Sequence, residues 1–285
     1  MTGNQRKVTR QVAIQTSLIL LSVLFAAPLL WMMSTALKPL NETMRTPPVW
    51  IPSQFKWGNF SDAFTYNSKE LGYIPFLVYG QNTVMITVLA IIGSLVSNAL
   101  VAYSFARIQW RGRETFFALT IATMMIPFPV MMVPLYALFR DLGWIGTFRP
   151  LWVPTFFGSA FNIFLLRQFL RTVPMELSEA AKIDGASEWR TFIDIILPLA
   201  RPALTVIAVF TFMWAWNDFL GPLIYLTDQK TYTLSMGLQF LQNQHTGTPW
   251  NLLMAASLIV IIPVIIVFFF AQKVFIQGIA TTGNK

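Results

Sequence analysis

Long apolar runs alternate with short polar segments along this chain of 285 residues. A helix needs about 20 mainly apolar residues to cross the hydrocarbon of a bilayer. Six runs approach or exceed that length, and we expect a span in each, which gives an all-α polytopic membrane protein with six transmembrane helices. The runs cover residues 11–37, 76–105, 115–139, 150–166, 202–227 and 252–271.

The ends and interruptions of these runs refine the prediction. Three basic residues precede the first run, but no small-residue cleavage site follows it, so we expect a retained helix and not a signal peptide. Segment 38–70 is polar, aromatic and proline-containing, which indicates an external segment. The third run holds Pro127, Pro129 and Pro134, so we expect it to be kinked or broken.

Composition supports the membrane interpretation. The chain is 55% hydrophobic and 11% charged, whereas soluble domains carry about a quarter charged residues. We expect a first helix with its external segment in 1–75, a transmembrane domain in 76–272 and a tail in 273–285. The net charge is +8, and most of the 20 basic residues fall in segments that face the cytoplasm if both termini lie inside. The charge therefore does not call for a nucleic-acid partner.

Chemistry that would indicate an enzyme is missing from the sequence. The chain has no cysteine and a single histidine, His245, in a polar segment typical of a solvated loop. It has no G-x-x-x-x-G-K-[ST] phosphate-binding loop, so any ATP energy must come from a partner. We expect no catalytic residue, metal or cofactor on this chain.

Five polar residues within or beside the runs are candidates for a transport path. An amide in lipid is costly without a partner, so these side chains either line a polar path or join helices. Asp218 is either a boundary residue bonded to its neighbours or a path residue, because it interrupts the fifth run. The five are Asn82, Asn98, Asn162, Asn217 and Asp218.

The polar stretch 171–201 predicts two short helices between two runs. Gly185 stands where a first helix would end in a left-handed residue, and Ser187 can cap a second helix. Periodicity predicts one shared face in each helix. These faces are Leu177, Ala180, Ala181 and Asp184 in the first and Trp189, Phe192, Ile193 and Ile196 in the second. The pattern itself allows either a loop lying on lipid headgroups or a docking element.

A resemblance favours docking. The spacing E-A-A-x3-G-x9-I-x-L-P is complete in this stretch and resembles the EAA signature of transmembrane subunits of bacterial ABC importers. Five further segments resemble carbohydrate-uptake permeases, most closely the six-helix type similar to the smaller maltose-importer permease: STALKP, FKWGNF, YSFARIQWRGR, AWNDFL and FIQGIATTGNK. The expected ATPase-docking residues are Glu179, Ala180, Ala181, Asp184, Gly185, Ile195, Leu197 and Pro198.

The resemblance implies a type I importer subunit in the bacterial inner membrane, N-in and C-in. Its implied partners are an ABC ATPase dimer, which holds ATP and Mg, a second homologous permease, an external solute-binding protein and membrane lipid. The implied solute is a sugar or oligosaccharide. Alternatives are another solute such as glycerol phosphate, or a membrane-embedded protein without transport. The segment 227–250 either reaches the binding protein or is a plain connector.

Overall fold

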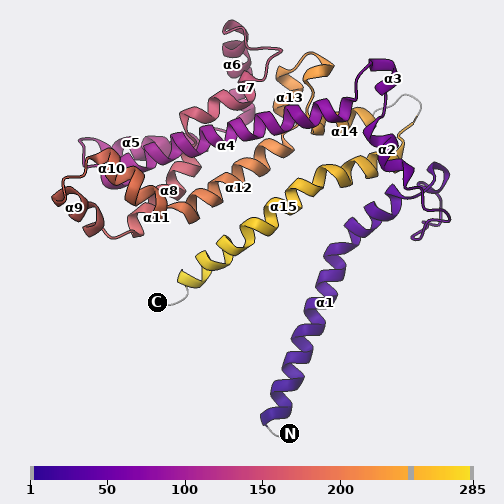
Figure 1. The fold of residues 1–285 in the computed structure, drawn as a ribbon, viewed down its shortest axis with the longest axis horizontal. Helices are drawn as coiled ribbons and strands as arrows, with labels where there is room; N and C mark the ends of the chain where they lie inside the picture. The colour runs from indigo at the N-terminus through magenta and orange to yellow at the C-terminus, as the bar shows by residue number, and fades with distance from the viewer. Residues whose placement is uncertain (1–2, 243–246, 283–285) are drawn as a thin grey trace. The chain divides into compact units, whose positions relative to one another are not determined.

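The computed structural model describes residues 3–242 and 247–282, and none of these forms a strand. Short 3-10 turns and one π-helical turn join the α-helices (Figure 1). The helices are α1 Gly3–Ala36, α2 Gly58–Phe64, α3 Ser68–Leu71, α4 Pro75–Arg107, α5 Arg113–Ala122, α6 Phe128–Asp141, α7 Arg149–Trp152, α8 Ala160–Thr172, α9 Glu176–Ile183, α10 Glu188–Arg190, α11 Leu197–Leu199, α12 Arg201–Asn217, α13 Leu220–Tyr225, α14 Leu234–Gln242 and α15 Trp250–Thr282.

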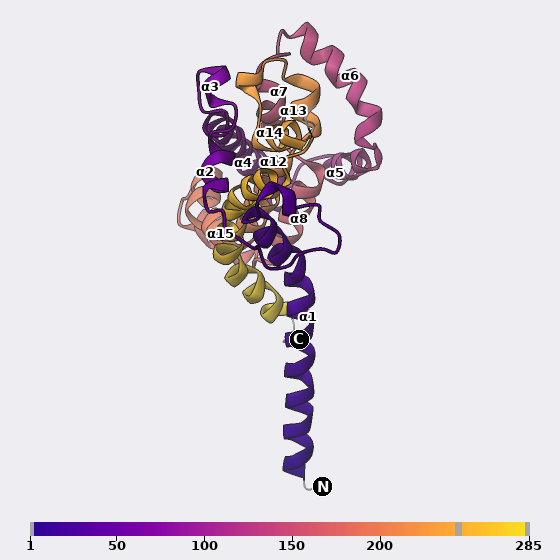
Figure 2. The same ribbon diagram turned by 90° about the vertical axis from the view of Figure 1, so that its right-hand side faces the viewer.

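Three helices in the described chain are long and apolar enough to cross a membrane by themselves: Arg10–Ala36, Pro75–Arg107 and Trp250–Gln272. Two bent pairs bring the possible number to five. α5 with its following turn meets α6 at 99°, as expected from the prolines, and Glu188–Leu199 meets α12 at 75°. Figure 2 shows the bend between α5 and α6. The expected fourth span is broken at Val153–Phe157, and its continuous helix, α8, has 13 residues.

α4 has two faces with opposite chemistry. Its exposed stripe repeats every fourth residue and consists of large apolar side chains, whereas its buried side carries small and polar residues. This is the pattern of a helix that meets lipid on one side and packs closely against helices on the other. The exposed stripe is Val84, Val88, Ile92, Val96 and Leu100, and the buried face includes Thr83, Thr87, Ala90, Gly93, Ser94, Ser97 and Asn98.

α4 is the centre of one compact unit, Pro75–Gly237 with Pro263–Lys285. Within it α4 packs against α8 and α12, which lie alongside it in Figure 1. Small residues such as Ala99, Ala102 and Ala203 let these helices approach closely. The buried cluster also includes Phe192 and Ile196 of the polar stretch, so that segment is anchored to the helices and does not hang free.

The second unit contains Met1–Ile74 and Leu238–Ile262. In this unit the amide nitrogen of Asn59 donates to the carbonyls of Ala36 and Lys38 at 2.7 and 2.9 Å. The Asn59 side-chain oxygen accepts from Asn251 at 3.2 Å. These bonds satisfy carbonyls at the open C-terminal end of α1. His245 lies outside the described residues.

Candidate functional site

The stretch that resembles the EAA signature folds as a helix, a turn and a second helix. α9 ends at Ile183, and Gly185 adopts the left-handed conformation with φ of +81°. The backbone N–H of Ala186 donates to the carbonyl of Ala181 at 2.9 Å, which closes the helix end. The Ser187 hydroxyl accepts from the N–H of Arg190 at 3.3 Å and caps α10. The predicted glycine turn and serine cap are confirmed.

The predicted single apolar face of the second helix is wrong. Residues Thr191–Ile196 form a π-helical turn, in which the longer hydrogen-bond step rotates side chains away from the α-helical repeat. Phe192 and Ile196 are buried in the core, whereas Trp189 and Ile193 are exposed. The second helix therefore divides its apolar residues between the protein interior and the surface.

The expected docking residues fall into two groups. Ala181 is buried, and Ile195 and Leu197 are half-buried, so these three help to seat the loop on the protein. The other members are exposed: Glu179, Ala180, Asp184, Gly185 and Pro198. A partner that approaches this surface would therefore meet two carboxylates and a tight turn.

Sequence reasoning missed the residue at the tip of this surface. Ile183 is 85% exposed, directly before the Asp184–Gly185 turn. The available signal was its place outside the predicted face of Leu177, Ala180, Ala181 and Asp184, directly before the expected Gly185 turn. Lys182 and Glu188 form an ion pair at 2.5 Å that links the two short helices beside it.

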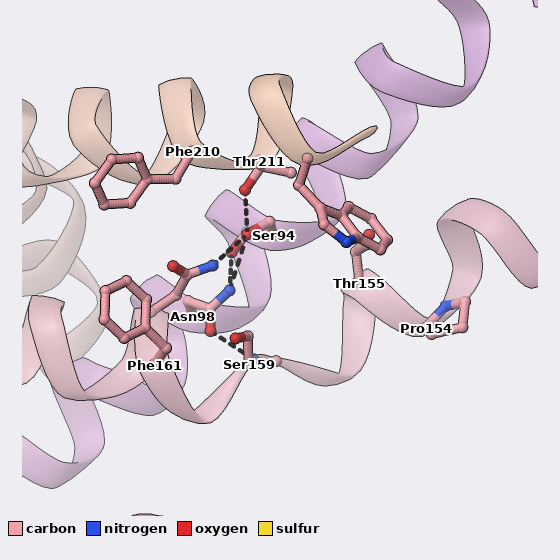
Figure 3. Close-up of a pocket in the computed structure, with 11 residues that line it drawn as sticks. Ser94, Asn98, Pro154, Thr155, Ser159, Phe161, Phe210 and Thr211 are labelled. Atoms are coloured by element: carbon pink, nitrogen blue, oxygen red, sulfur yellow. Dashed lines mark hydrogen bonds between the residues drawn. The ribbon is translucent and has the colours of Figure 1, made fainter. Parts of the chain in front are cut away.

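A second candidate site is a cavity of about 390 Å³ within the unit around α4, with a mainly apolar surface that carries several polar groups (Figure 3). It is lined by amide and hydroxyl side chains together with three aromatic rings, and none of its lining residues carries a charge. The lining is Ser94, Asn98, Pro154, Thr155, Gly158, Ser159, Phe161, Asn162, Phe210, Thr211 and Trp214.

The Ser94 hydroxyl lies at the centre of this cavity. Its oxygen accepts hydrogen bonds from the amide of Asn98 at 3.1 Å, the amide of Asn162 at 3.2 Å and the hydroxyl of Thr211 at 3.1 Å (Figure 3). Three helices, α4, α8 and α12, thus meet at one oxygen. Two of the predicted path residues, Asn98 and Asn162, are brought together here.

A break in the chain forms one wall of the cavity. Gly158 has φ of +84°, and the backbone after it enters α8. Asn98 Oδ1 accepts from the Ser159 N–H at 2.8 Å, and the Ser97 hydroxyl donates to the Thr155 carbonyl at 2.8 Å. Irregular backbone at membrane depth requires such internal partners. The sequence signal for them was the i, i+4 pair Ser94 and Asn98 inside an apolar run, but their partners 61 and 117 positions away were not foreseen.

The other three predicted path residues lie apart from this cavity. Asn82 donates to the carbonyls of Lys230 and Tyr232 at 2.8 and 2.9 Å, which joins α4 to a distant loop. Asn217 is exposed and donates to the carbonyl of Met213, one turn earlier in its own helix. Asp218 follows the end of α12 and accepts from the Gly221 N–H at 3.1 Å. Its carboxyl group also lines a separate, mainly apolar cavity of about 460 Å³.

The described part of the chain contains no group of three or more His, Cys, Asp or Glu residues that could hold a metal ion. Neither of the two candidate sites offers groups for covalent chemistry. The loop presents a surface, and the cavity presents hydrogen-bonding groups beside aromatic rings. The loop is suited to binding a partner, and the cavity is suited to binding a small molecule.

Known proteins similar to this chain are membrane transport components. It is 34% identical over 260 residues to the arabinooligosaccharides transport system permease protein AraQ of Halalkalibacterium halodurans, covering 90% of each chain. It is 30% identical to the sn-glycerol-3-phosphate transport system permease protein UgpE of Agrobacterium fabrum, covering 97% of this chain and 98% of UgpE.

A solved structure shares the fold. A chain of a bacterial ABC transporter that imports the acidic polysaccharide alginate matches with a TM-score of 0.80 at 22% identity, covering 96% of this chain and 98% of that one. The family model described as "binding-protein-dependent transport system inner membrane component" matches residues 98–281, which include the loop and every residue that lines the cavity except Ser94. The chain therefore belongs to the family of inner membrane components of binding-protein-dependent transport systems, and it is a permease subunit, not an enzyme.

Proposed function

We propose that this chain forms half of the path of an ATP-driven sugar importer and couples to its ATPase through the loop 171–201. The observation that carries the proposal is the exposed tip of that loop, where Ile183 stands beside Asp184 and the Gly185 turn. An isoleucine exposed next to charged groups gains free energy when a partner covers it. The exposed members of the EAA signature, Glu179 and Ala180 among them, share this short segment.

The proposed complex contains a homologous second permease, two ATPase subunits that hold ATP and Mg, and an external solute-binding protein. Binding of ATP would close the ATPase dimer and move the loop, and the surrounding helices would then turn the path from inward-open to outward-open. In this arrangement both termini lie in the cytoplasm, 76–272 is the transmembrane domain and 273–285 is a cytoplasmic tail. We also propose that 227–250 faces the binding protein.

The chemistry of the cavity supports an uncharged, hydroxyl-rich solute. Asn98 and Asn162 supply amides, Ser94 and Thr211 supply hydroxyls, and no charged side chain lines the cavity. Hydrogen-bonding groups combined with aromatic faces are the usual equipment of a small-molecule pocket. A sugar ring offers hydroxyls to the former and C–H faces to the latter. Among the five predicted path residues, we therefore propose Asn162, which is half-buried, as a path residue in this subunit, and Asn98, which is completely buried, as the residue that holds the wall of the path.

A glycerol phosphate importer is the second candidate, because the Agrobacterium UgpE relative carries that name. A phosphate group is usually bound by Arg, Lys or backbone N–H groups, and charged donors give the strongest bonds. The cavity lining lacks Arg and Lys, which favours the neutral sugar. Uptake of each solute by the assembled complex separates the two candidates.

Copurification tests the role of the loop. The tagged chain is purified from membranes in mild detergent, and the subunits that accompany it are identified by mass. We expect an ATPase and a second permease with the native chain, and loss of the ATPase with Gly185→Pro. Proline cannot adopt φ of +81° and removes the N–H that donates to the Lys182 carbonyl at 3.1 Å.

Gly143 provides the matched control. It has φ of +67°, its N–H donates to the Arg140 carbonyl at 2.9 Å, and it too follows a helix end, far from the loop in sequence. Gly143→Pro should retain the ATPase. If the native chain purifies without an ATPase, or if Gly185→Pro retains it, the loop is not the docking element.

A further inference from the structure

The last turns of α4 carry two buried polar side chains, Tyr103 and Arg107, that the proposed docking surface and the cavity do not include. They are four positions apart, so they project from the same face of the helix. Both face the loop 171–201. Their contacts explain how that loop is attached to the rest of its unit.

Arg107 holds the beginning of the loop. Its guanidinium donates to the carbonyls of Leu170 and Val173 at 2.9 and 2.7 Å and to that of Pro174 at 3.3 Å. These carbonyls belong to the C-terminal end of α8 and the residues that follow, where helix carbonyls lack intrahelical partners and the dipole is negative. Within the described residues Arg107 has no carboxylate at ion-pair distance, so its charge is matched by this helix end.

Tyr103 holds the second helix of the loop. Its hydroxyl donates to Glu188 Oε2 at 2.8 Å, and the other carboxylate oxygen of Glu188 pairs with Lys182 of α9. The Tyr103 ring also packs against Phe192, with 4.9 Å between ring centroids. The phenol therefore reaches α10 directly and α9 through one carboxylate. A bond to a charged acceptor is stronger than one between neutral groups.

The same helix also lines the cavity around Ser94. Ser94 and Asn98 lie on α4, and at about 1.5 Å per residue Arg107 is roughly 20 Å along the helix axis from Ser94. From Leu95 to Arg107 α4 contains neither proline nor glycine, so the part of the helix between the cavity and the loop carries no residue typical of a hinge. A displacement of the end of α4 at Arg107 would therefore be transmitted along the helix to the cavity.

We propose that Tyr103 and Arg107 are positioning residues that make α4 and the loop one rigid body, so that displacement of the loop by the ATPase moves the Ser94–Asn98 wall of the cavity. This inference rests on the proposed function. The mechanical link has two anchors, Arg107 at the start of the loop and Tyr103 at its second helix. Cutting one anchor should leave the docking surface present while reducing the movement that docking transmits to α4.

The test measures solute imported per ATP hydrolysed by the reconstituted importer with its binding protein. Tyr103→Phe removes the hydroxyl and keeps the ring on Phe192. We expect the complex to assemble and hydrolyse ATP while the import-to-hydrolysis ratio falls about fivefold or more, in the range of typical couplings between sites. Tyr136→Phe is the control, because the Tyr136 hydroxyl has no hydrogen bond within the described structure and its side chain is exposed.

Glu188→Ala removes the acceptor from an exposed position and supplies a second route to the same loss. If the two residues act through each other, the double variant Tyr103→Phe with Glu188→Ala should lower the ratio no further than the stronger single variant. A merely structural contact would lower the melting temperature of the complex and leave the ratio unchanged. Import by the native complex with unchanged ratios in both single variants would overturn this inference and leave the proposed function standing; no ATP-driven import by the native complex would overturn both.

Discussion

Asn98 and Ser159 are 61 positions apart, and the side-chain oxygen of Asn98 accepts the backbone N–H of Ser159 at 2.8 Å. The same amide donates to the Ser94 carbonyl at 2.6 Å. Asn98 is completely buried, so water cannot replace it. This one side chain therefore satisfies the backbone at the break before α8 and fixes that break to α4.

Replacing Asn98 by Ala should destabilise the protein. The change removes the acceptor of the Ser159 N–H from a part-buried hydrogen bond, which costs about 0.5–1.5 kcal/mol. A lower melting temperature of the purified variant would show the loss. Asn217→Ala is the control, since the amide of Asn217 is exposed and bonds its own helix. Equal melting temperatures for the two variants would contradict the assigned role of Asn98.

Replacing Asn162 by Leu should weaken transport with little effect on assembly. Asn162 is half-buried, and the bond from its amide to Ser94 is one of three at that oxygen. Loss of one neutral hydrogen bond to a solute costs about 0.5–1.5 kcal/mol, so the apparent KM for the loaded binding protein should rise about two- to tenfold. Uptake into proteoliposomes measures it. Unchanged uptake would remove Asn162 from the path.

Asp218→Asn should leave transport within about twofold of native, a change below 0.5 kcal/mol on the usual scale. Asp218 Oδ1 accepts the Gly221 N–H at 3.1 Å, and an asparagine oxygen can accept the same bond. A side-chain oxygen that accepts from a backbone N–H three residues later is typical of a helix start, here that of α13. Loss of import by a fully assembled complex would instead place the carboxylate charge in the path.

The local features of this chain could be predicted, and the long-range ones could not. The Gly185 turn and the break at Pro127 follow from backbone geometry at single residues, so sequence suffices for them. The π-helical turn at Thr191–Ile196 depends on how Phe192 and Ile196 pack into a core built from other helices, which periodicity does not contain. The wrong prediction of a single apolar face in the second helix resulted from this dependence on distant packing.

The asparagines illustrate the same limit within one residue type. Asn98 and Asn162 meet at Ser94, whereas Asn82 and Asn217 bond to backbone elsewhere. In the sequence all four asparagines lie within or beside apolar runs, so the pattern does not distinguish them. The difference is which face of each helix turns inward, and this is decided by packing partners far away in the chain.

Ser53→Ala should make the stability of the protein less dependent on pH between pH 7 and pH 3. The Ser53 hydroxyl and N–H both donate to the carboxylate of Glu42, and these bonds hold the pKa of Glu42 below its ordinary range. A carboxyl with a depressed folded pKa stabilises above its unfolded pKa, near 4.3, and the contribution is lost as pH falls through the folded value. The melting temperature of the variant should be below that of the native protein at pH 7, and the two melting temperatures should converge as the pH is lowered to 3. Parallel curves would exclude this role for Glu42.

Ile183→Ala should weaken ATPase binding without disturbing the fold. Ile183 is 85% exposed, so the folded chain gains little from it, whereas covering an isoleucine by a partner is worth about 1.5–3 kcal/mol. Ala retains part of that surface, so we expect the dissociation constant for the ATPase to rise about fivefold to thirtyfold, measured by titrating purified ATPase onto the membrane complex in nanodiscs. Met125→Ala, at 84% exposure outside the loop, should bind as native does. Equal affinity of both variants would show that the partner leaves Ile183 uncovered and that the loop docks through its charged residues instead.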